Sequence, residues 1–148
     1  MRAGLRAATA SDCRLFYDYV NRPDSLAHKL ATKGPIPWEE HEAWFMRRVR
    51  DPDCHMWVVT GDNEPIGQLR LTRGPEGWEV DIYVAEQHRG GGLARAAIAQ
   101  AIDLIRKDEN GAVVVARVLP HNRASCRLFE STGFRLAGRE PDHLVYLI

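Results

Sequence analysis

The chain has 148 residues, 45% of them hydrophobic, which suits one domain with its own core and is short for two. Twenty Lys and Arg residues balance twenty Asp and Glu residues, so the charge pattern gives no reason to expect nucleic acid or an anionic membrane as a partner. The three cysteines are far apart, and no histidines stand at metal-ligand spacing. No apolar run has the length of a signal peptide or of a membrane span of about 18 residues. We therefore expect one cytoplasmic domain over residues 1–148, with reduced cysteines and no metal.

The N-terminal third is predicted to contain one strand and two helices. Residues 4–8 form the strand, and Asp12 is among the residues able to cap a first helix that ends near Pro23. Periodicity is lost over residues 24–37, where Gly and Pro indicate a loop of the kind that often forms a substrate-specific wall. A second helix follows that loop and ends at Asp51-Pro52. Its apolar face carries Trp38, His41, Trp44 and Phe45, and the histidine there is either a buried core residue or a catalytic one.

The rest of the chain alternates between strand and helix patterns. An antiparallel meander of three strands leads to an apolar helix that begins after Gly92 and ends near Asn110-Gly111. A strand buried on both faces follows that helix, so right-handed crossover geometry makes it the parallel neighbour of the third meander strand. A last helix runs to about Ser131, and a hairpin closes the chain. The expected strands cover residues 56–60, 66–72, 80–84, 112–118, 134–138 and 143–148.

Three consecutive glycines, Gly90, Gly91 and Gly92, join the strand at residues 80–84 to the apolar helix. A helix N-terminus presents unpaired N–H groups and the positive end of the helix dipole, and glycines let a phosphate approach the backbone closely. Neither a P-loop nor the Gly-x-Gly-x-x-Gly dinucleotide motif fits this spacing. By itself, the turn is equally consistent with a phosphate site and with a flexible connection between strand and helix.

The pattern Gln87-x-x-Gly90-x-Gly92, followed by Leu93-Ala94, resembles the coenzyme A pyrophosphate loop of the Gcn5-related N-acetyltransferase (GNAT) superfamily. Two further segments resemble that superfamily: Leu5 to Asp12 its first strand and helix entry, and Asn122-x-x-Ser125-x-x-Leu128-Phe129-x-x-x-Gly133-Phe134 its fourth-helix motif. The resemblance implies a mixed α/β fold of about seven strands, mostly antiparallel, with a central splayed parallel pair and about four flanking helices. It also implies acetyl-CoA as the acetyl donor and direct transfer to a primary amine.

The same resemblance implies where the cofactor binds. The pantetheine arm would lie along the central strand and the pyrophosphate on backbone N–H groups of the glycine turn. Asn122 would add a cofactor contact, and it can also cap the last helix. The backbone N–H of Val84 would stabilise the thioester oxyanion. The implied cofactor-binding residues are Ile82, Tyr83, Val84, Arg89, Gly90, Gly91, Gly92, Leu93, Ala94 and Asn122.

Acetylation of an amine needs a base, and three side chains are candidates. Glu79 and Asp81 lie one strand step apart on one face near the expected gap, and His41 is the third. The two carboxylates are equally consistent with an ordinary solvated strand face. Phe129 stands where many members of the superfamily carry the tyrosine that protonates the leaving thiolate, and phenylalanine cannot donate a proton. Tyr83, another side chain or solvent would then supply that proton, unless the step is unassisted.

The acceptor is expected to be a small-molecule amine, and the protein to be a monomer or a homodimer. Asn21-Arg22-Pro23 and the segment Ile36 to Phe45 are similar to the acetyltransferase of pseudaminic acid biosynthesis, which modifies the 4-amino group of a nucleotide-linked deoxysugar. A protein N-terminal acetyltransferase of the ribosomal-protein type is the alternative enzyme. A coenzyme A-binding module without catalysis is the alternative from another class, which Phe129 keeps open.

Overall fold

The computed structural model describes residues 1–30 and 34–148. Its strands form one seven-stranded sheet in the order β1-β2-β3-β4-β5-β7-β6. Neighbouring strands run antiparallel except for β4 and β5, which are parallel. This arrangement confirms the predicted mixed α/β sheet with a central parallel pair. The strands are β1 (Ala3–Ala7), β2 (Cys54–Gly61), β3 (Glu64–Arg73), β4 (Trp78–Val84), β5 (Val114–Val118), β6 (Arg135–Arg139) and β7 (Leu144–Leu147).

Five α-helices accompany the sheet within the described residues. They are α1 (Cys13–Val20), α2 (Pro23–Leu26), α3 (Trp38–Arg48), α4 (Leu93–Asp108) and α5 (Arg123–Ser131), with short 3-10 turns η1 (Ala10–Asp12) and η2 (Glu86–His88). The sequence predicted about four helices and missed α2, a single turn inside the segment expected to be a loop. Pro23 both follows the end of α1 and occupies the first turn of α2, where its missing N–H does no harm. Residues 31–33 of the expected loop lie outside the described residues.

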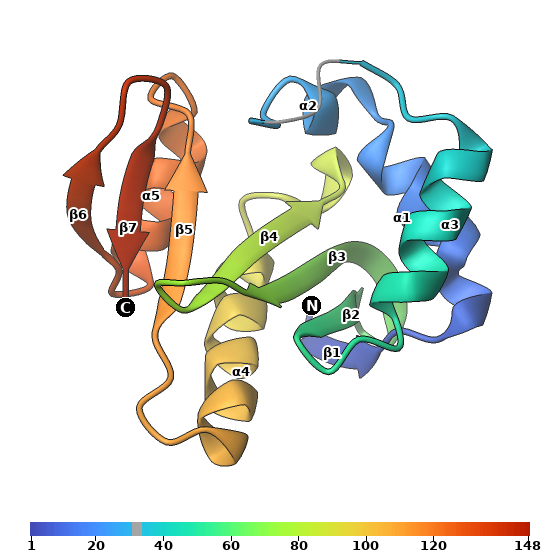
Figure 1. The fold of residues 1–148 in the computed structure, drawn as a ribbon, viewed down its shortest axis with the longest axis horizontal. Helices are drawn as coiled ribbons and strands as arrows, with labels where there is room; N and C mark the ends of the chain where they lie inside the picture. Colours follow the sequence, from blue (N-terminus) through green and yellow to red (C-terminus); the bar gives the residue numbers. More distant parts are fainter. Residues whose placement is uncertain (31–33) are drawn as a thin grey trace.

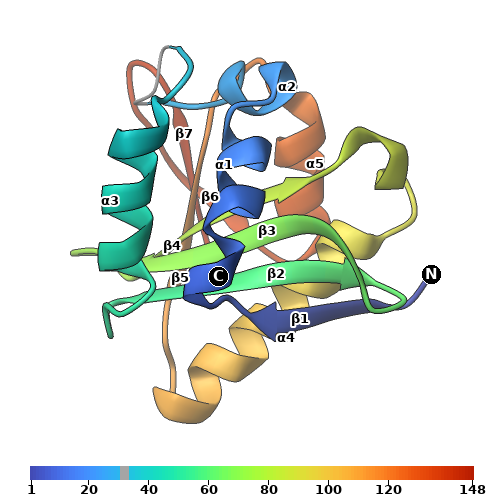
Figure 2. The same ribbon diagram turned by 90° about the vertical axis from the view of Figure 1, so that its right-hand side faces the viewer.

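Helices cover both faces of the sheet (Figure 2). On one face α1 and α3 pack over β2, and Phe16, Phe45, Met56 and Val58 form that core. On the other face α4 packs through the apolar positions that recur at helical spacing, among them Ala97, Ile98, Ala101 and Ile102. Because successive strand residues point to opposite faces, the central strands contribute side chains to both cores.

The parallel strands β4 and β5 pair near their N-terminal ends and then separate (Figure 1). Trp78 and Glu79 of β4 are paired with β5, and the later residues of these two fully described strands are not paired with each other. Beyond that point β4 continues along β3 as far as Val84, whereas β5 continues along β7 as far as Val118. A gap therefore opens between the C-terminal halves of β4 and β5, and α2 lies above it in Figure 1.

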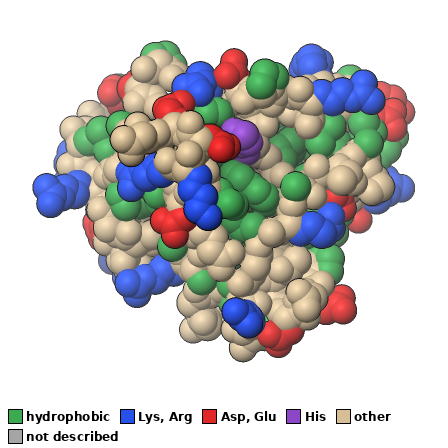
Figure 3. Space-filling view, turned by 90° about the horizontal axis from the view of Figure 1, so that it is seen from below, with side chains coloured by type: hydrophobic (Ala, Val, Ile, Leu, Met, Phe, Trp, Pro, Cys, Tyr) green, Lys and Arg blue, Asp and Glu red, His purple; other side chains and the backbone are tan. Residues whose placement is uncertain are grey.

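Charged side chains are distributed without a single-sign patch on the face shown in Figure 3, where basic and acidic groups are interspersed. This distribution agrees with the equal numbers of basic and acidic residues in the sequence. Across the part of the chain that the structure describes, no helix combines the length and the apolar character needed to cross a bilayer.

Candidate active site

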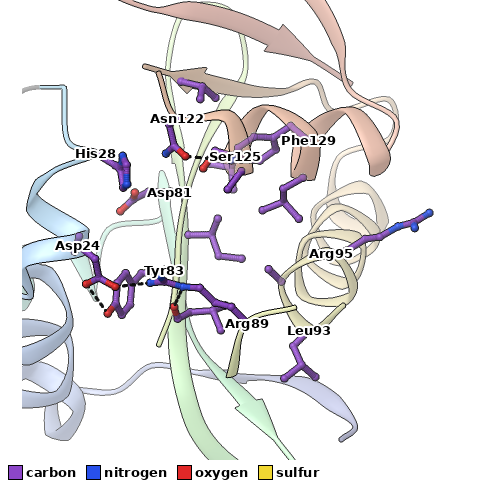
Figure 4. A pocket seen from close by; sticks show the side chains of 18 of the residues that line it. Asp24, His28, Asp81, Tyr83, Arg89, Leu93, Arg95, Asn122, Ser125 and Phe129 are labelled. Carbon is purple, nitrogen blue, oxygen red and sulfur yellow. Dashed lines mark hydrogen bonds and ion pairs between the residues drawn. The ribbon is translucent and has the colours of Figure 1, made fainter. Parts of the chain in front are cut away.

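A cleft of about 470 Å³ occupies the gap between β4 and β5 and is bounded by α4 and α5, with the α2 segment at its mouth (Figure 4). We call it the first cleft. Nine of the ten predicted cofactor-binding residues line it, and Gly91 does not. The nine are Ile82, Tyr83, Val84, Arg89, Gly90, Gly92, Leu93, Ala94 and Asn122. The first cleft thus brings together the strand, turn and helix residues that the resemblance grouped.

The glycine turn has the backbone geometry of an anion site. Gly90 and Gly92 adopt the left-handed conformation, with φ of 85° and 78°, whereas Gly91 does not. A Cβ at Gly90 or Gly92 would meet no protein atom within 4 Å, so the space beside them is open to the first cleft that they line. Gly92 is the N-cap of α4 and offers no capping side chain, so the N–H groups of residues 93–95 have no intrahelical acceptor. These donors, together with the helix dipole, fit a pyrophosphate.

One backbone edge of β4 faces the gap. In an antiparallel ladder, alternate residues direct their N–H groups toward the neighbouring strand and the others direct them away. The Ala85 N–H donates to the Ile66 carbonyl at 2.8 Å on the β3 side, and the Trp78 N–H donates to the Val113 carbonyl on the β5 side. Val84 shares the parity of Trp78, so its N–H points away from β3 and into the gap. This is the N–H that was predicted to stabilise the oxyanion.

Asp24 of α2 ties β4 to the glycine turn. Its carboxylate accepts a 2.9 Å hydrogen bond from the Tyr83 hydroxyl and a 2.6 Å bond from Nη2 of Arg89, and Nε of Arg89 donates to the Val84 carbonyl at 2.8 Å. Burial alone would raise the pKa of Asp24, but the bonds from Arg89 and Tyr83 bring it below the ordinary carboxyl value. Burial and the bond to Asp24 raise the pKa of Tyr83. The Tyr83 proton is therefore directed to a carboxylate and is poorly placed to protonate a thiolate.

Asn122 caps α5 and also lines the first cleft (Figure 4). Its side-chain oxygen accepts a 3.2 Å bond from the Ser125 N–H, which confirms the predicted cap. Phe129 lines the same cleft and packs against Phe134, with ring centroids 5.0 Å apart. The wall of the cleft therefore has an apolar ring at the position where many superfamily members carry a phenol.

A second cleft, of about 560 Å³, extends from β4 to α3 and to the residues that follow α2. All three base candidates, His41, Glu79 and Asp81, line this second cleft. Of the three, Asp81 alone also lines the first cleft. The two clefts share His28, Lys29, Val80, Asp81 and Arg117, so they meet where β4 and β5 begin to separate.

Cations hold both of the candidate carboxylates. Nζ of Lys29 lies 3.1 and 2.9 Å from the two oxygens of Asp81, and Nη2 of Arg70 lies 3.6 Å from one of them. Burial alone would raise the pKa of Asp81, but the charges of Lys29 and Arg70 bring it well below the ordinary value. Asp81 is therefore ionised at neutral pH and a weak proton acceptor. Glu79 is half-exposed and accepts a 2.7 Å bond from Nε of Arg117.

His41 is buried among aromatic rings, with 2% of its surface exposed. Its Nε2 lies 3.0 Å from the carbonyl oxygen of Cys13, and because a carbonyl only accepts, Nε2 carries the proton. The imidazole stacks on Phe45, with ring centroids 5.8 Å apart. Burial lowers the pKa of His41, and the bond to Cys13 acts in the opposite direction. This environment favours a core histidine, although the residue also borders the second cleft.

The sequence matches the family described as acetyltransferase (GNAT) domain over residues 2–135. The chain belongs to the GNAT acetyltransferase family. The matched domain is accordingly an acetyltransferase domain of the kind that uses acetyl-CoA as its acyl donor, as the resemblance implied. The comparison covers the strand, the glycine turn and the helix of the first cleft, and it extends through α5.

Individual relatives are similar to this chain over nearly its whole length. An uncharacterized protein of Methanocaldococcus jannaschii is 26% identical over an alignment of 144 positions that covers 92% of this chain, and the chain spans 29% of the length of that relative. A domain from the same organism has a TM-score of 0.87 at 21% identity, covering 99% of this chain and 97% of that one. Spermidine N-acetyltransferase from Vibrio cholerae, solved with CoA and spermine, has a TM-score of 0.84 at 22% identity, covering 99% and 94%. Both solved structures share the GNAT fold with this chain.

Sequence reasoning did not single out three residues at this GNAT site: Asp24, His28 and Lys29. They belong to α2 and the turn after it, which is too short for a helical period to be visible. The partners of Lys29 and Asp24 lie 52 to 65 positions away, at distances that no local pattern reveals. The local signal that could have revealed α2 is Pro23 followed by an acidic residue, a combination typical of the first turn of a helix.

Proposed function

We propose that acetyl-CoA binds in the first cleft, that the acceptor amine binds in the second, and that transfer takes place where the clefts meet. The open space beside Gly90 and Gly92 and the N–H groups at the start of α4 suit the pyrophosphate. The exposed edge of β4 suits the amide groups of the pantetheine arm, which can pair with it as an added strand would. The N–H of Val84 faces the same gap and suits an oxyanion.

The observation that carries the acceptor proposal is the surplus of positive charge in the second cleft. Four basic and three acidic side chains line it: Lys29, Arg47, Arg70, Arg117, Glu40, Glu79 and Asp81. Asp81 is shared between Lys29 and Arg70, so one negative charge faces two positive ones. Such an arrangement attracts an anionic group and repels a polycation. We infer an acceptor that carries both an amine and an anionic group.

A nucleotide-linked 4-amino sugar meets this requirement, because its diphosphate supplies the negative charge and its sugar the amine. The similarity of residues 21–23 and 36–45 to the acetyltransferase of pseudaminic acid biosynthesis supports the same class. The spermidine enzyme of Vibrio cholerae, solved with spermine, shares the fold. A polyamine is nevertheless disfavoured in this chain, because its several ammonium groups would enter a cleft with a cationic surplus.

The same cations help the acceptor to become a nucleophile. An ammonium group placed beside Lys29 and Arg70, which share one carboxylate, is disfavoured, so its pKa falls and a larger fraction is free amine. The free amine attacks the thioester carbon, and the negative charge that develops on the carbonyl oxygen lies near the N–H of Val84. Ion pairing keeps Asp81 charged throughout this sequence, so its role is to position Lys29.

The test is an acetyl-CoA turnover assay with four acceptors: a nucleotide-linked 4-amino sugar, the same sugar without the nucleotide, spermine, and a peptide with a free N-terminus. We expect the nucleotide-linked sugar to react fastest, with a KM about tenfold below that of the free sugar. Arg47→Gln should raise the KM for the nucleotide-linked sugar only. Arg50→Gln, which lies beyond α3 and outside the cleft, is the matched control.

Three outcomes would count against the acceptor proposal, the third against its electrostatic part alone. Faster turnover of spermine would show that the cationic surplus does not select the acceptor. Faster turnover of the peptide would instead support an N-terminal acetyltransferase of the ribosomal-protein type. Equal KM values for the sugar with and without its nucleotide would remove the electrostatic argument while leaving an amino-sugar acetyltransferase in place.

A further inference from the structure

His28 stands where the two clefts meet. It follows α2 and lines both the first and the second cleft. Figure 4 shows its ring projecting from the α2 segment toward the side of the cleft that carries Asn122. The ring also lies against that of His121, in the loop before α5, with centroids 5.8 Å apart. The imidazole therefore extends from one wall of the gap toward the other.

The segment that carries His28 is anchored on both sides. Before it, the Asp24 carboxylate is bonded to Tyr83 and Arg89. After it, Lys29 is bonded to both oxygens of Asp81. These contacts tie the turn to β4 from two directions, so the position of the imidazole above the gap is determined by the protein itself.

The other ionisable side chains at the junction are already engaged. Asp81 is paired with two cations, Glu79 is bonded to Arg117, and the Tyr83 hydroxyl donates to a carboxylate. Across residues 1–30 and 34–148, the His28 ring has a ring neighbour but no side-chain hydrogen bond or ion pair that competes for a proton. Its nitrogens are therefore available to a substrate.

We propose that His28 is the proton-transfer residue of the reaction, taking the proton that the acceptor nitrogen releases and passing it to the departing sulfur. The inference rests on the proposed function. The acceptor enters as a free amine, its ammonium proton having already gone to solvent. As the C–N bond forms, one nitrogen proton moves to the imidazole; as the C–S bond breaks, the imidazolium returns it to the thiolate. The products are the acetamide and the CoA thiol, and His28 ends neutral.

This assignment places two roles on one side chain. It supplies the base, a role for which Glu79, Asp81 and His41 are the candidates by sequence. It also supplies the acid that Phe129 cannot provide. A group that lines only one of the clefts would reach either the amine or the sulfur, whereas His28 borders both.

The charges around His28 keep it in the form that the first step needs. His121 faces it from the loop before α5, Arg89 from the glycine turn, Asp24 from α2, and the ion pair of Lys29 and Asp81 from β4. Partial burial at the mouth of the cleft lowers the pKa of His28, the charges of His121 and Arg89 lower it further, and Asp24 acts in the opposite direction. The imidazole is thus neutral at pH 7, and its conjugate acid is strong enough to protonate a thiolate, whose ordinary pKa is about 8.5.

The experiment compares kcat/KM as a function of pH for the wild type, His28→Gln and His121→Gln, with the acceptor that the wild type uses best. In the wild type both the amine and His28 must lose a proton, so log kcat/KM should fall on the acid side with a slope near two, roughly twice that of a single group. In His28→Gln only the amine still has to lose a proton, so the acid-side slope of log kcat/KM should fall to near one. The kcat/KM of this variant should be about 100-fold lower than that of the wild type, while its affinity for acetyl-CoA, measured by calorimetry, stays unchanged. The maximal kcat/KM of His121→Gln should stay within about threefold of the wild-type value. Because His121 lowers the pKa of His28, the part of the pH profile that reports His28 should move to higher pH in this variant.

Chemical rescue provides a second readout. Added imidazole should restore part of the turnover of His28→Ala, because the residue is exposed at the mouth of the cleft. A His28→Gln protein with the wild-type rate and the wild-type slope overturns this inference and leaves the proposed function intact. A wild type that acetylates none of the amines overturns the proposed function, and the assignment of His28 with it.

Discussion

The ammonium group of Lys29 contacts both carboxylate oxygens of Asp81, at 3.1 and 2.9 Å, across 52 positions of sequence. Both side chains are largely shielded from water, with 18% and 28% of their surfaces exposed. Arg70 is a second cation beside the same carboxylate. The contact binds the segment after α2 to the central strand and leaves unbalanced positive charge in the second cleft. The geometry of the acceptor site therefore depends on this pair.

Lys29→Met should destabilise the protein by about 1–2 kcal/mol, between the values for exposed and fully buried ion pairs, because Arg70 remains beside Asp81. Because the pKa of Asp81 is lower in the folded state than in the unfolded chain, ionised Asp81 adds to the free energy of unfolding at pH values above about 3.9, the ordinary carboxyl pKa. This contribution is lost as the pH falls through the lower pKa of the folded state. The difference between variant and wild type in denaturant unfolding should therefore be largest near neutral pH. Lys107→Met, on the outer face of α4, is the matched control. Equal stability of Lys29→Met and wild type at pH 7 would contradict the prediction.

Asn122→Ala should cost about 1 kcal/mol of stability, because the N–H of Ser125 loses its acceptor, and should also weaken acetyl-CoA binding. Asn122→Ser separates the two roles, since a serine hydroxyl can still cap α5 but lacks the amide that lines the first cleft. We expect thermal unfolding to return to nearly the wild-type midpoint in Asn122→Ser while calorimetric affinity stays reduced. Wild-type affinity in both variants would leave the residue with a capping role alone.

The sequence predicted the sheet well because its strands carry local patterns. Alternating side chains from Val80 to Val84 and the continuous apolar run at residues 112–118 each indicate a strand, and one helix between them makes the two strands parallel. The boundaries moved by a few residues: the apolar run begins at Ala112, but β5 begins at Val114. Helix α2 escaped detection because a single turn cannot display a 3.6-residue period.

The residues of the candidate site also fall into two groups, those with a local sequence signal and those without one. Residues of the glycine turn and the strand before it were predictable because the motif is contiguous in sequence. The Asp24 to Arg89 contact spans 65 positions, and no periodicity marks either partner. Candidate bases were chosen by residue type and face, but their ability to accept a proton depends on neighbours such as Lys29 and Arg117, which only the tertiary structure identifies.

Gly92→Ala should weaken acetyl-CoA binding at least about tenfold, while Gly91→Ala should leave it within about twofold. Gly92 has φ of 78° and lines the first cleft, so a Cβ there is both strained and directed into the space proposed for the pyrophosphate. Gly91 has no positive φ and does not line the cleft, which makes it a control within the same turn. Calorimetric titration of folded protein with acetyl-CoA measures the difference. Equal losses in the two variants would point to general loosening of the turn instead.

His41→Leu should lower stability by about 1–2 kcal/mol at pH 7.5 and leave kcat near the wild-type value, because the lost interaction is the buried bond to the Cys13 carbonyl.

Burial lowers the pKa of His41, so the folded state resists a proton that the unfolded chain accepts below its ordinary pKa of about 6.5. In the wild type, the contribution of His41 to the free energy of unfolding is therefore fully present above about pH 6.5. It declines as the pH falls through the lower pKa of His41 in the folded state. The variant lacks that decline, so the difference in unfolding free energy between the two proteins should narrow from pH 7.5 to pH 5. His28, whose pKa is also lowered, is present in both proteins and cancels in the comparison. Denaturant unfolding at the two pH values measures the narrowing, and a large fall in kcat at unchanged stability would instead restore His41 as a catalytic residue.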